Sequence, residues 1–136
     1  MAPCAVMDAN RIAVFPDFAN LPPEELQELA VAMTEVEVHA EATVIHVDDY
    51  GSAVYLIEDG SADVLNADGD AIEALGPGDT FGEIGLLLTR QRTATVVART
   101  PMLLLSLSGQ DFDGIRPRVP EVERALRRIG LKRDSQ

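Results

Sequence analysis

The spacing of apolar residues divides the chain into three zones, and the first of them is helical. In residues 8–33 apolar side chains recur every three or four positions, which is the period of an α-helix. Pro22-Pro23-Glu24-Glu25 favours a helix start, because proline fits a first turn and carboxylates interact well with the positive end of the helix dipole. The apolar positions that follow are Leu26, Leu29, Ala30 and Met33, with Phe15 and Phe18 expected to pack beneath them.

The second zone, residues 36–107, consists of short runs rich in β-branched and other apolar residues. Turn sequences separate these runs, namely Asp59-Gly60, Asp68-Gly69-Asp70 and Gly76-Pro77-Gly78-Asp79. Many short strands at a spacing of about ten residues predict an antiparallel β jelly-roll barrel. The expected strands are Val36–His39, Thr43–Val47, Val54–Ile57, Ala62–Leu65, Ala71–Leu75, Thr93–Ala98 and Leu103–Leu107.

The third zone, residues 109–131, has a helical pattern again. Ser108 is expected to cap its first helix, because a serine hydroxyl accepts a hydrogen bond from a free backbone N–H of the first turn. Pro117 and Pro120 interrupt the zone, and Pro120 suits the first turn of a final helix that we expect to end soon after Gly130. The pattern therefore predicts an α+β fold in which a β-barrel lies between N-terminal and C-terminal helices.

Length and composition agree with one globular domain over residues 1–136. Hydrophobic residues make up 46% and charged residues 25% of the chain. The net charge is −12, which repels phosphate backbones and so disfavours binding of nucleic acids. Seven of the 11 basic residues fall in residues 116–136, so the acidic body of the chain has four arginines. These are Arg11, Arg90, Arg92 and Arg99.

Targeting signals are not evident in the sequence. The single cysteine, Cys4, cannot form an internal disulfide, which favours a reducing compartment. The N-terminus lacks the basic and apolar regions of a signal peptide, and no apolar run approaches the roughly 18 residues of a spanning helix. We expect a cytoplasmic protein without membrane insertion.

The segment from Gly76 to Ala98 contains the residues that indicate a function. Gly82 and Gly85 would leave backbone N–H groups open to a ligand, and N–H groups at a helix start bind anions. Arg92 follows nine residues after Glu83, and an arginine fork matches a phosphate in charge and geometry. Together with the Thr93 hydroxyl, these groups would fit a ligand that has one phosphate and a sugar hydroxyl.

This segment resembles the phosphate-binding cassette of the cyclic-nucleotide-binding domain family. That family includes the catabolite activator protein, the regulatory subunits of cyclic-nucleotide-dependent kinases and the cyclic-nucleotide-gated channels. The matching residues run Phe81-Gly82-Glu83-Ile84-Gly85-Leu86-Leu87 and then Arg92-Thr93-Ala94. The resemblance extends from about Phe15 to Ile129 and includes the run Val54-Tyr55-Leu56-Ile57 before Gly60.

The resemblance implies a role for each residue of the motif. Glu83 would accept a hydrogen bond from the ribose 2′-hydroxyl, and Arg92 would pair with the cyclic phosphate. Backbone N–H groups around Ile84 and Gly85 would complete the phosphate site with Thr93. A C-terminal helix would close over the base, and its movement would be the signal. The expected ligand-binding residues are Phe81, Gly82, Glu83, Ile84, Gly85, Arg92, Thr93 and Ala94, with Val64 and Leu75 as walls of the base pocket.

The sequence departs from the family pattern at three places. Glu41 and Asp48-Asp49 stand where the family often has glycine and Gly-Asp, both in barrel turns. The final helix is short, and the segment leaves no room for the DNA-binding helices of the catabolite activator. Arg133 stands where the channels have a base-contacting arginine.

Ordinary structural explanations compete with each of these roles. Arg92 could pair with Glu83, Glu83 could merely favour a helix start, and Thr93 could be a β-former. The complete motif favours the ligand roles for all three. Arg90 is interpreted as a surface residue of the loop.

We therefore expect a stand-alone cyclic-nucleotide sensor, not an enzyme, that binds cyclic AMP first and cyclic GMP next. No metal or cofactor is expected. The alternative is a degenerate member that binds no nucleotide and serves as a protein-interaction domain. A cupin-type metal enzyme is disfavoured, because His39 and His46 lack the tight His-x-His spacing of such sites. An effector protein, a homodimer interface or simple buffering of the nucleotide remain open as outputs.

Overall fold

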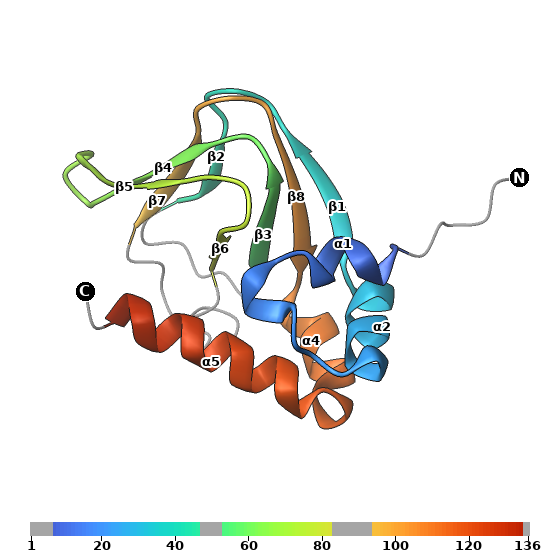
Figure 1. Ribbon diagram of the computed structural model, residues 1–136. Coiled ribbons are helices and arrows are strands. Elements are labelled where there is room, and N and C mark those ends of the chain that lie inside the picture. Colours follow the sequence, from blue (N-terminus) through green and yellow to red (C-terminus); the bar gives the residue numbers. More distant parts are fainter. Residues whose placement is uncertain (1–6, 47–52, 83–93, 135–136) are drawn as a thin grey trace, which may run out of the picture.

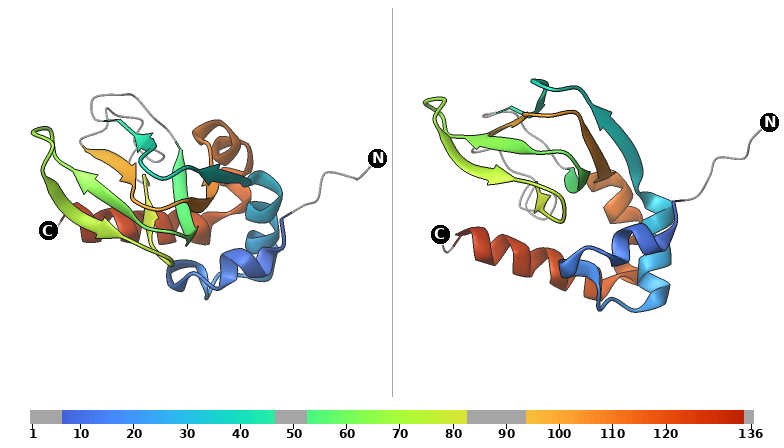
Figure 2. Two further views of the ribbon diagram at one scale, coloured as in Figure 1. Left: turned by 90° about the horizontal axis from the view of Figure 1, so that it is seen from above. Right: turned by 45° about the horizontal axis from the view of Figure 1, so that its top comes forward.

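Two antiparallel sheets form a sandwich, and helices from both ends of the chain pack at one end of it (Figures 1 and 2). The computed structural model describes residues 7–46, 53–82 and 94–134, with the course of the helix alone for residues 130–134. The first sheet has the order β1 (Thr34–Val38), β8 (Met102–Leu107), β3 (Val54–Asp59) and β6 (Thr80–Phe81). The second has the order β2 (Thr43–Ile45), β7 (Thr95–Ala98), β4 (Ala62–Leu65) and β5 (Ala71–Leu75). The predicted α+β class is confirmed.

Each of the seven predicted strands has a counterpart, and the differences lie at strand ends. Strand β1 begins at Thr34, two residues before its expected start, because Thr34 and Glu35 pair with β8 although both are exposed and polar. Strand β6 was not predicted. It has two residues, which is too short for a periodic signal, and it is fixed by pairing of Phe81 with Tyr55.

The helices begin where the sequence indicates, and one ends later. The N-terminal zone contains α1 (Ala9–Ala13), a 3-10 turn η1 (Pro16–Phe18) and α2 (Pro23–Ala32). The C-terminal zone contains α4 (Gly109–Ile115), a 3-10 turn η2 (Arg116–Arg118) and α5 (Pro120–Asp134). The Ser108 hydroxyl accepts a hydrogen bond from the Asp111 N–H at 3.1 Å, which confirms the predicted cap. The last helix was expected to end soon after Gly130, and it ends at Asp134. Gly130 does not stop it, because one glycine costs a helix about 1 kcal/mol and no proline follows.

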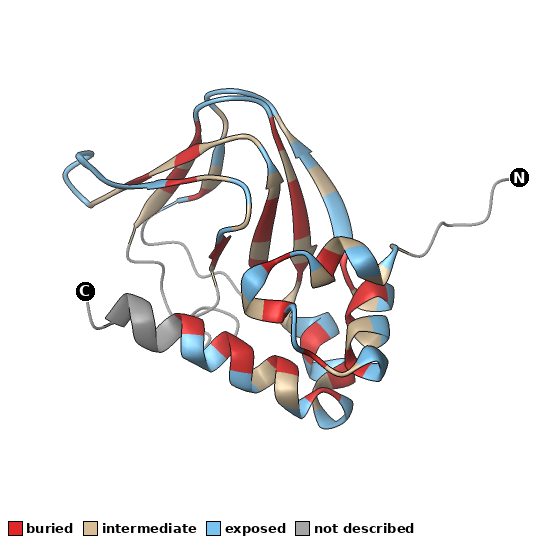
Figure 3. Ribbon diagram, in the orientation of Figure 1, coloured by how far each residue is buried: buried red, intermediate tan, exposed pale blue. Residues whose placement is uncertain are grey.

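Strands β3 and β8 are buried on both faces. Leu56 and Leu105 pair across the two strands and pack in one core with the helices. Their neighbours Ile57 and Leu104 also pair, and they pack in a second core between the two sheets. All four side chains are at most 1% exposed, and Figure 3 shows the buried segments of both strands in red. This double burial explains why both strands are continuous apolar runs, whereas β1 alternates.

Several described residues have a positive φ, and Glu41 and Gly60 are two of them. Glu41, where the resembling family often has glycine, has φ of 71°. Gly60 joins β3 to β4 with φ of 92°, and a Cβ there would lie 2.4 Å from the Pro101 carbonyl oxygen. Gly60 therefore meets two requirements at once, a positive φ and close approach of another backbone.

Gly60→Ala is expected to lower the free energy of unfolding by about 3 kcal/mol or more, because backbone strain and a steric clash act together. Gly69→Ala is the matched control, since Gly69 has φ of 88° but open space around its Cβ position. The control should lose about 1–2 kcal/mol from backbone strain alone. Urea unfolding of both variants measures the difference, and equal losses would contradict the steric argument.

Candidate functional site

The structure brings together the predicted site residues that it describes. Val64, Leu75 and Phe81 are 8%, 3% and 3% exposed and belong to the core between the sheets. Ala94 packs against the same core. Residues from β4, β5 and β6 and the residue before β7 (Thr95–Ala98) thus meet at one apolar region, where they were expected to wall and border a ligand pocket.

Strand pairing fixes how these side chains lie. Val64 pairs with Val96 of β7, and Leu75 pairs with Ala62 of β4. The Phe81 ring stacks on Tyr55 of β3, with centroids 5.1 Å apart and planes 24° from parallel. Tyr55 was not predicted to belong to the site. Its position opposite Phe81 depends on β6, the strand that the sequence pattern did not reveal.

Gly82 follows β6 with φ of 87°, a conformation that favours glycine. A side chain at this position would strain the backbone directly after β6. The local geometry therefore explains one glycine of the motif. Glu83, Ile84, Gly85, Arg92 and Thr93 lie outside the described residues, and their roles remain predictions.

Two of the four arginines in the acidic body have structural roles. Arg11 of α1 donates hydrogen bonds to Glu35 of β1 and to both carboxylate oxygens of Glu58 on β3, and this pairing raises the pKa of Arg11. Arg99 bonds to Asp63 at 2.6 Å, which raises the pKa of Arg99 in the same direction. Arg90 and Arg92, the two that remain, belong to the motif segment.

The helix expected to close over the ligand, α5, packs through one apolar face. Its buried residues recur at helical spacing and join the core shared with α2 and the first sheet. A carboxylate from α2 caps the first turn of α5. Glu25 accepts hydrogen bonds from the Glu121 and Val122 N–H groups, both at 2.9 Å. The buried residues of this face are Val122, Ala125, Leu126 and Ile129.

Glu25 has a role that the sequence analysis missed. It lies in the first turn of its own helix, as expected, but its side chain is 6% exposed and binds the start of α5. One signal could have revealed this. Glu25 precedes Leu29 by four residues and therefore lies on the buried face of α2, where a carboxylate needs a hydrogen-bonding partner.

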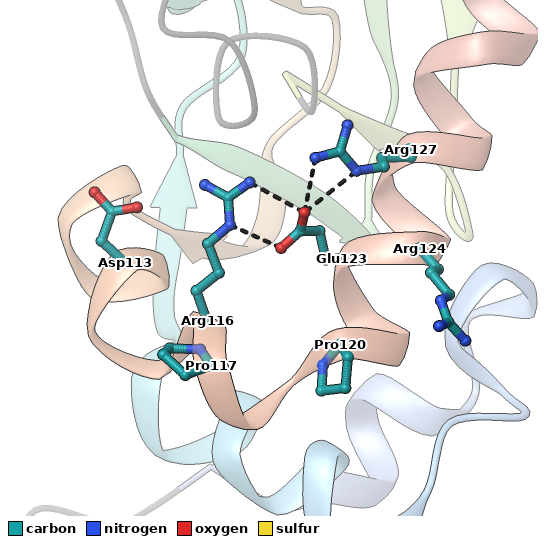
Figure 4. A pocket seen from close by; sticks show the side chains of 7 residues that line it. All are labelled: Asp113, Arg116, Pro117, Pro120, Glu123, Arg124 and Arg127. Atoms are coloured by element: carbon teal, nitrogen blue, oxygen red, sulfur yellow. Dashed lines mark hydrogen bonds and ion pairs between the residues drawn. The ribbon is translucent and has the colours of Figure 1, made fainter.

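A hollow at the junction of α4, η2 and α5 gathers charged side chains (Figure 4). Glu123 lies at its centre and bonds to Arg116 at 2.7 and 3.0 Å and to Arg127 at 2.7 and 3.3 Å. These two arginines lower the pKa of Glu123 to about 2. The hollow is lined by Asp113, Arg116, Pro117, Pro120, Glu123, Arg124 and Arg127.

Of the residues expected to bind a nucleotide, those that the structure describes do not line this hollow. The guanidinium groups of Arg116, Arg124 and Arg127 are paired with carboxylates of the same chain. The pairs stabilise the turn through which α4 and η2 lead into α5. We therefore assign the hollow a structural role.

His39 and His46 are exposed at the ends of β1 and β2. Within the described ranges, no three or more His, Cys, Asp or Glu side chains gather where they could hold a metal ion. Of the helices in the part of the chain that the structure describes, none has the length and apolar character needed to cross a bilayer.

Known proteins share both the sequence pattern and the fold. Residues 35–117 match the family model described as the cyclic nucleotide-binding domain. A cyclic nucleotide-gated potassium channel from Mesorhizobium japonicum is 34% identical over 122 residues, which cover 90% of this chain and 34% of the channel. The chain thus spans about a third of the length of this relative.

Two solved structures are similar over most of the chain. The regulatory domain of Toxoplasma gondii protein kinase A, crystallised with cyclic AMP, is 27% identical with a TM-score of 0.71, covering 79% of this chain and 44% of that one. The regulatory subunit of a cyclic AMP-independent protein kinase A from Trypanosoma cruzi, bound to guanosine, is 28% identical with a TM-score of 0.72. That match covers 85% of this chain and 42% of the trypanosome chain.

Glu123→Gln is expected to lower the free energy of unfolding at pH 7 by about 1–2 kcal/mol, allowing for partial exposure of the carboxylate. Because its pKa is about 2 in the folded protein and near 4.5 ordinarily, the stabilisation is complete above pH 4.5. It is lost as the pH falls through the folded pKa. Urea unfolding from pH 7 to pH 2 measures this, and the parent and the variant should converge at the acid end.

Glu121→Gln is the control, because among the described side chains Glu121 pairs with one arginine, Arg124, and both side chains are more exposed. It should lose no more than about 0.5 kcal/mol. Equal losses at pH 7 would show that Glu123, which pairs with two arginines, stabilises the fold no more than Glu121 does.

Proposed function

Because the chain belongs to the cyclic nucleotide-binding domain family, a family of regulatory, non-catalytic modules, we propose that it binds a cyclic nucleotide and responds by moving its C-terminal helices. Cyclic AMP is the expected ligand, with cyclic GMP next. One observation carries the proposal. The motif segment starts at Phe81 and ends at Ala94, and both residues reach the apolar core that Val64 and Leu75 line.

The proposed chemistry divides the ligand between an apolar and a polar part. The base would lie against the side of the sandwich formed by Val64 and Leu75, and the ribose hydroxyl would bind Glu83. Arg92 would pair with the cyclic phosphate through two parallel hydrogen bonds, the strong geometry for a guanidinium and an anion. Thr93 and the backbone N–H groups near Gly85 would complete the contacts.

The net charge of −12 does not prevent this binding. Long-range repulsion between exposed charges is screened within about 10 Å at 0.1 M salt. Arg11 and Arg99 are held by carboxylates of the chain, so of the four arginines in the acidic body the one that meets the ligand would come from the motif. A single small anion held by local contacts is therefore compatible with an acidic domain.

A second candidate is a nucleoside without phosphate. The T. cruzi regulatory subunit is bound to guanosine and is described as independent of cyclic AMP. The T. gondii domain, of nearly equal similarity to this chain, was crystallised with cyclic AMP. We favour the phosphate-bearing ligand, because this chain has Arg92 and Thr93 in its motif. A domain that binds neither ligand would be the interaction module considered above.

Cyclic AMP at 100 times its Kd should stabilise the protein by about 2.7 kcal/mol, which raises the melting temperature by about 10 °C for a domain of this size. Thermal unfolding with cyclic AMP, cyclic GMP, 5′-AMP and guanosine measures the shift. The parent should respond most to cyclic AMP. No shift with any cyclic nucleotide at millimolar concentration would contradict the proposal, and a shift with guanosine alone would favour the nucleoside.

Arg92→Ala should abolish the shift, because the cyclic phosphate loses its charged partner. Arg90→Ala is the matched control, since it removes the same charge two residues away in the same segment. The control should keep the shift within a few degrees of the parent. Equal responses of the two variants would show that Arg92 is not the phosphate ligand.

The ribose contact can be tested from both sides. 2′-Deoxy cyclic AMP should bind the parent about 10- to 100-fold more weakly, because it lacks the hydroxyl that donates to Glu83. Glu83→Ala should bind cyclic AMP more weakly by a similar factor and should not distinguish the two nucleotides. Calorimetric titration of the parent and Glu83→Ala with each of the two nucleotides gives the coupling free energy between Glu83 and the 2′-hydroxyl. If the two losses in binding free energy are additive, the hydroxyl does not bind Glu83.

A further inference from the structure

Two stacked aromatic rings at the edge of the first sheet face the space between the sheets. Tyr55 of β3 pairs with Phe81 of the edge strand β6, and their ring centroids are 5.1 Å apart. Side chains alternate between the two faces of a strand. Leu56 packs in the core shared with the helices, so its neighbour Tyr55 lies on the opposite face and packs against the core between the sheets. That core also contains Val64 and Leu75 of the second sheet.

The two stacked residues differ in how far they are covered. Phe81 is 3% exposed, whereas the side chain of Tyr55 is half-buried. The Tyr55 hydroxyl has no hydrogen-bond partner among the described residues, and it is not fully buried. A tyrosine hydroxyl both donates and accepts, and it ordinarily finds a partner when its ring is covered. The hydroxyl of Tyr55 is therefore available to a ligand that enters this space.

Strand order places Tyr55 near the polar part of the proposed ligand. The base would lie against Val64 and Leu75, which belong to the second sheet. The proposed polar contacts come from the motif, and the motif begins at Phe81 of the first sheet, directly opposite Tyr55. The sugar and the phosphate would therefore lie on the side of the first sheet, next to the two stacked rings.

A phosphate suits this hydroxyl better than the other parts of the ligand. The free oxygens of a cyclic phosphate are ionised at neutral pH, so they accept hydrogen bonds and donate none. Hydrogen bonds to an ionised acceptor are roughly twice as strong as bonds between neutral groups. Tyr55 also loses little freedom on binding, because its ring has two rotatable side-chain bonds and is already stacked on Phe81.

We propose that Tyr55 is a further ligand-binding residue, whose hydroxyl donates a hydrogen bond to the phosphate of the bound cyclic nucleotide. The inference rests on the proposed function, in which this chain binds such a nucleotide. It adds a phosphate contact from a strand outside the motif to those of Arg92 and Thr93. The contact would also favour a cyclic nucleotide over guanosine, which has no phosphate.

Tyr55→Phe in the full chain tests the contact, because it removes the hydroxyl and keeps the stacked ring. Cyclic AMP and cyclic GMP share the sugar and the phosphate, so both should bind about tenfold more weakly to the variant. Calorimetric titration measures the four affinities. Equal affinities of the parent and the variant would overturn the proposal. A loss confined to one nucleotide would place the hydroxyl at the base and would overturn it as well.

Tyr50→Phe is the matched control. The chain has two tyrosines, and Tyr50 lies outside the described residues. The control should bind both nucleotides as the parent does. Without ligand, Tyr55→Phe should melt within about 2 °C of the parent, because the hydroxyl has no partner to lose in the described part of the chain. A fall well beyond this would show that the hydroxyl stabilises the fold, which contradicts the proposal.

The phosphorus NMR resonance of bound cyclic AMP gives a readout that does not depend on affinity. At saturating protein, the resonance in Tyr55→Phe should differ from that in the parent, because the phosphate has lost a donor. The resonance in Tyr50→Phe should coincide with that in the parent. Coincidence of all three resonances would show that the phosphate does not contact Tyr55.

The two proposals fail in different ways. If neither cyclic nucleotide binds the parent, the proposed function fails, and the contact with Tyr55 fails with it. If the parent binds cyclic AMP and Tyr55→Phe binds it equally well, the role of Tyr55 is refuted and the proposed function stands.

Discussion

The fold depends on the burial of β3 and β8 on both faces. Ile57 and Leu104 need a second sheet to cover them, while Leu56 and Leu105 need the helices on the opposite face. One sheet thus requires two partner layers, and neither layer can be lost without exposing several fully buried side chains. The helices are therefore part of the fold and not attachments to a self-sufficient barrel, and any movement of the helices acts directly on the strands.

The ion pairs show how an acidic chain uses few arginines. Arg11 and Arg99 each bind two carboxylates and fasten elements that are distant in sequence. In the basic C-terminal zone the ratio is reversed, since Glu123 is shared by Arg116 and Arg127. In the acidic body an arginine lies between two carboxylates, and in the basic zone a carboxylate lies between two arginines. Each such group forms charge-assisted hydrogen bonds with two partners.

The candidate site lies where the two sheets meet, and its described part is apolar. Phe81, stacked on Tyr55, and the paired strands of Val64 and Leu75 provide a rigid wall. The polar residues that the motif adds, Glu83 and Arg92, would supply the specificity. A rigid apolar wall with a few polar groups is the usual composition of a small-molecule site.

The sequence by itself determined the motif and, apart from β6, the order and type of the main helices and strands. Helical and strand periods, the proline at the start of α2, the Ser108 cap and the turn sequences involve residues close along the chain, so local patterns contain them. The roles of Glu83 and Arg92 rest on the motif and stay predictions. In contrast, the tertiary structure decided that β6 pairs with β3 and that Arg11 binds β1 and β3. It also decided that Glu25 holds a helix 96 residues away. Such partners come together only through packing of the whole chain, because a buried carboxylate accepts whichever donor the fold brings within reach, and no local pattern specifies it.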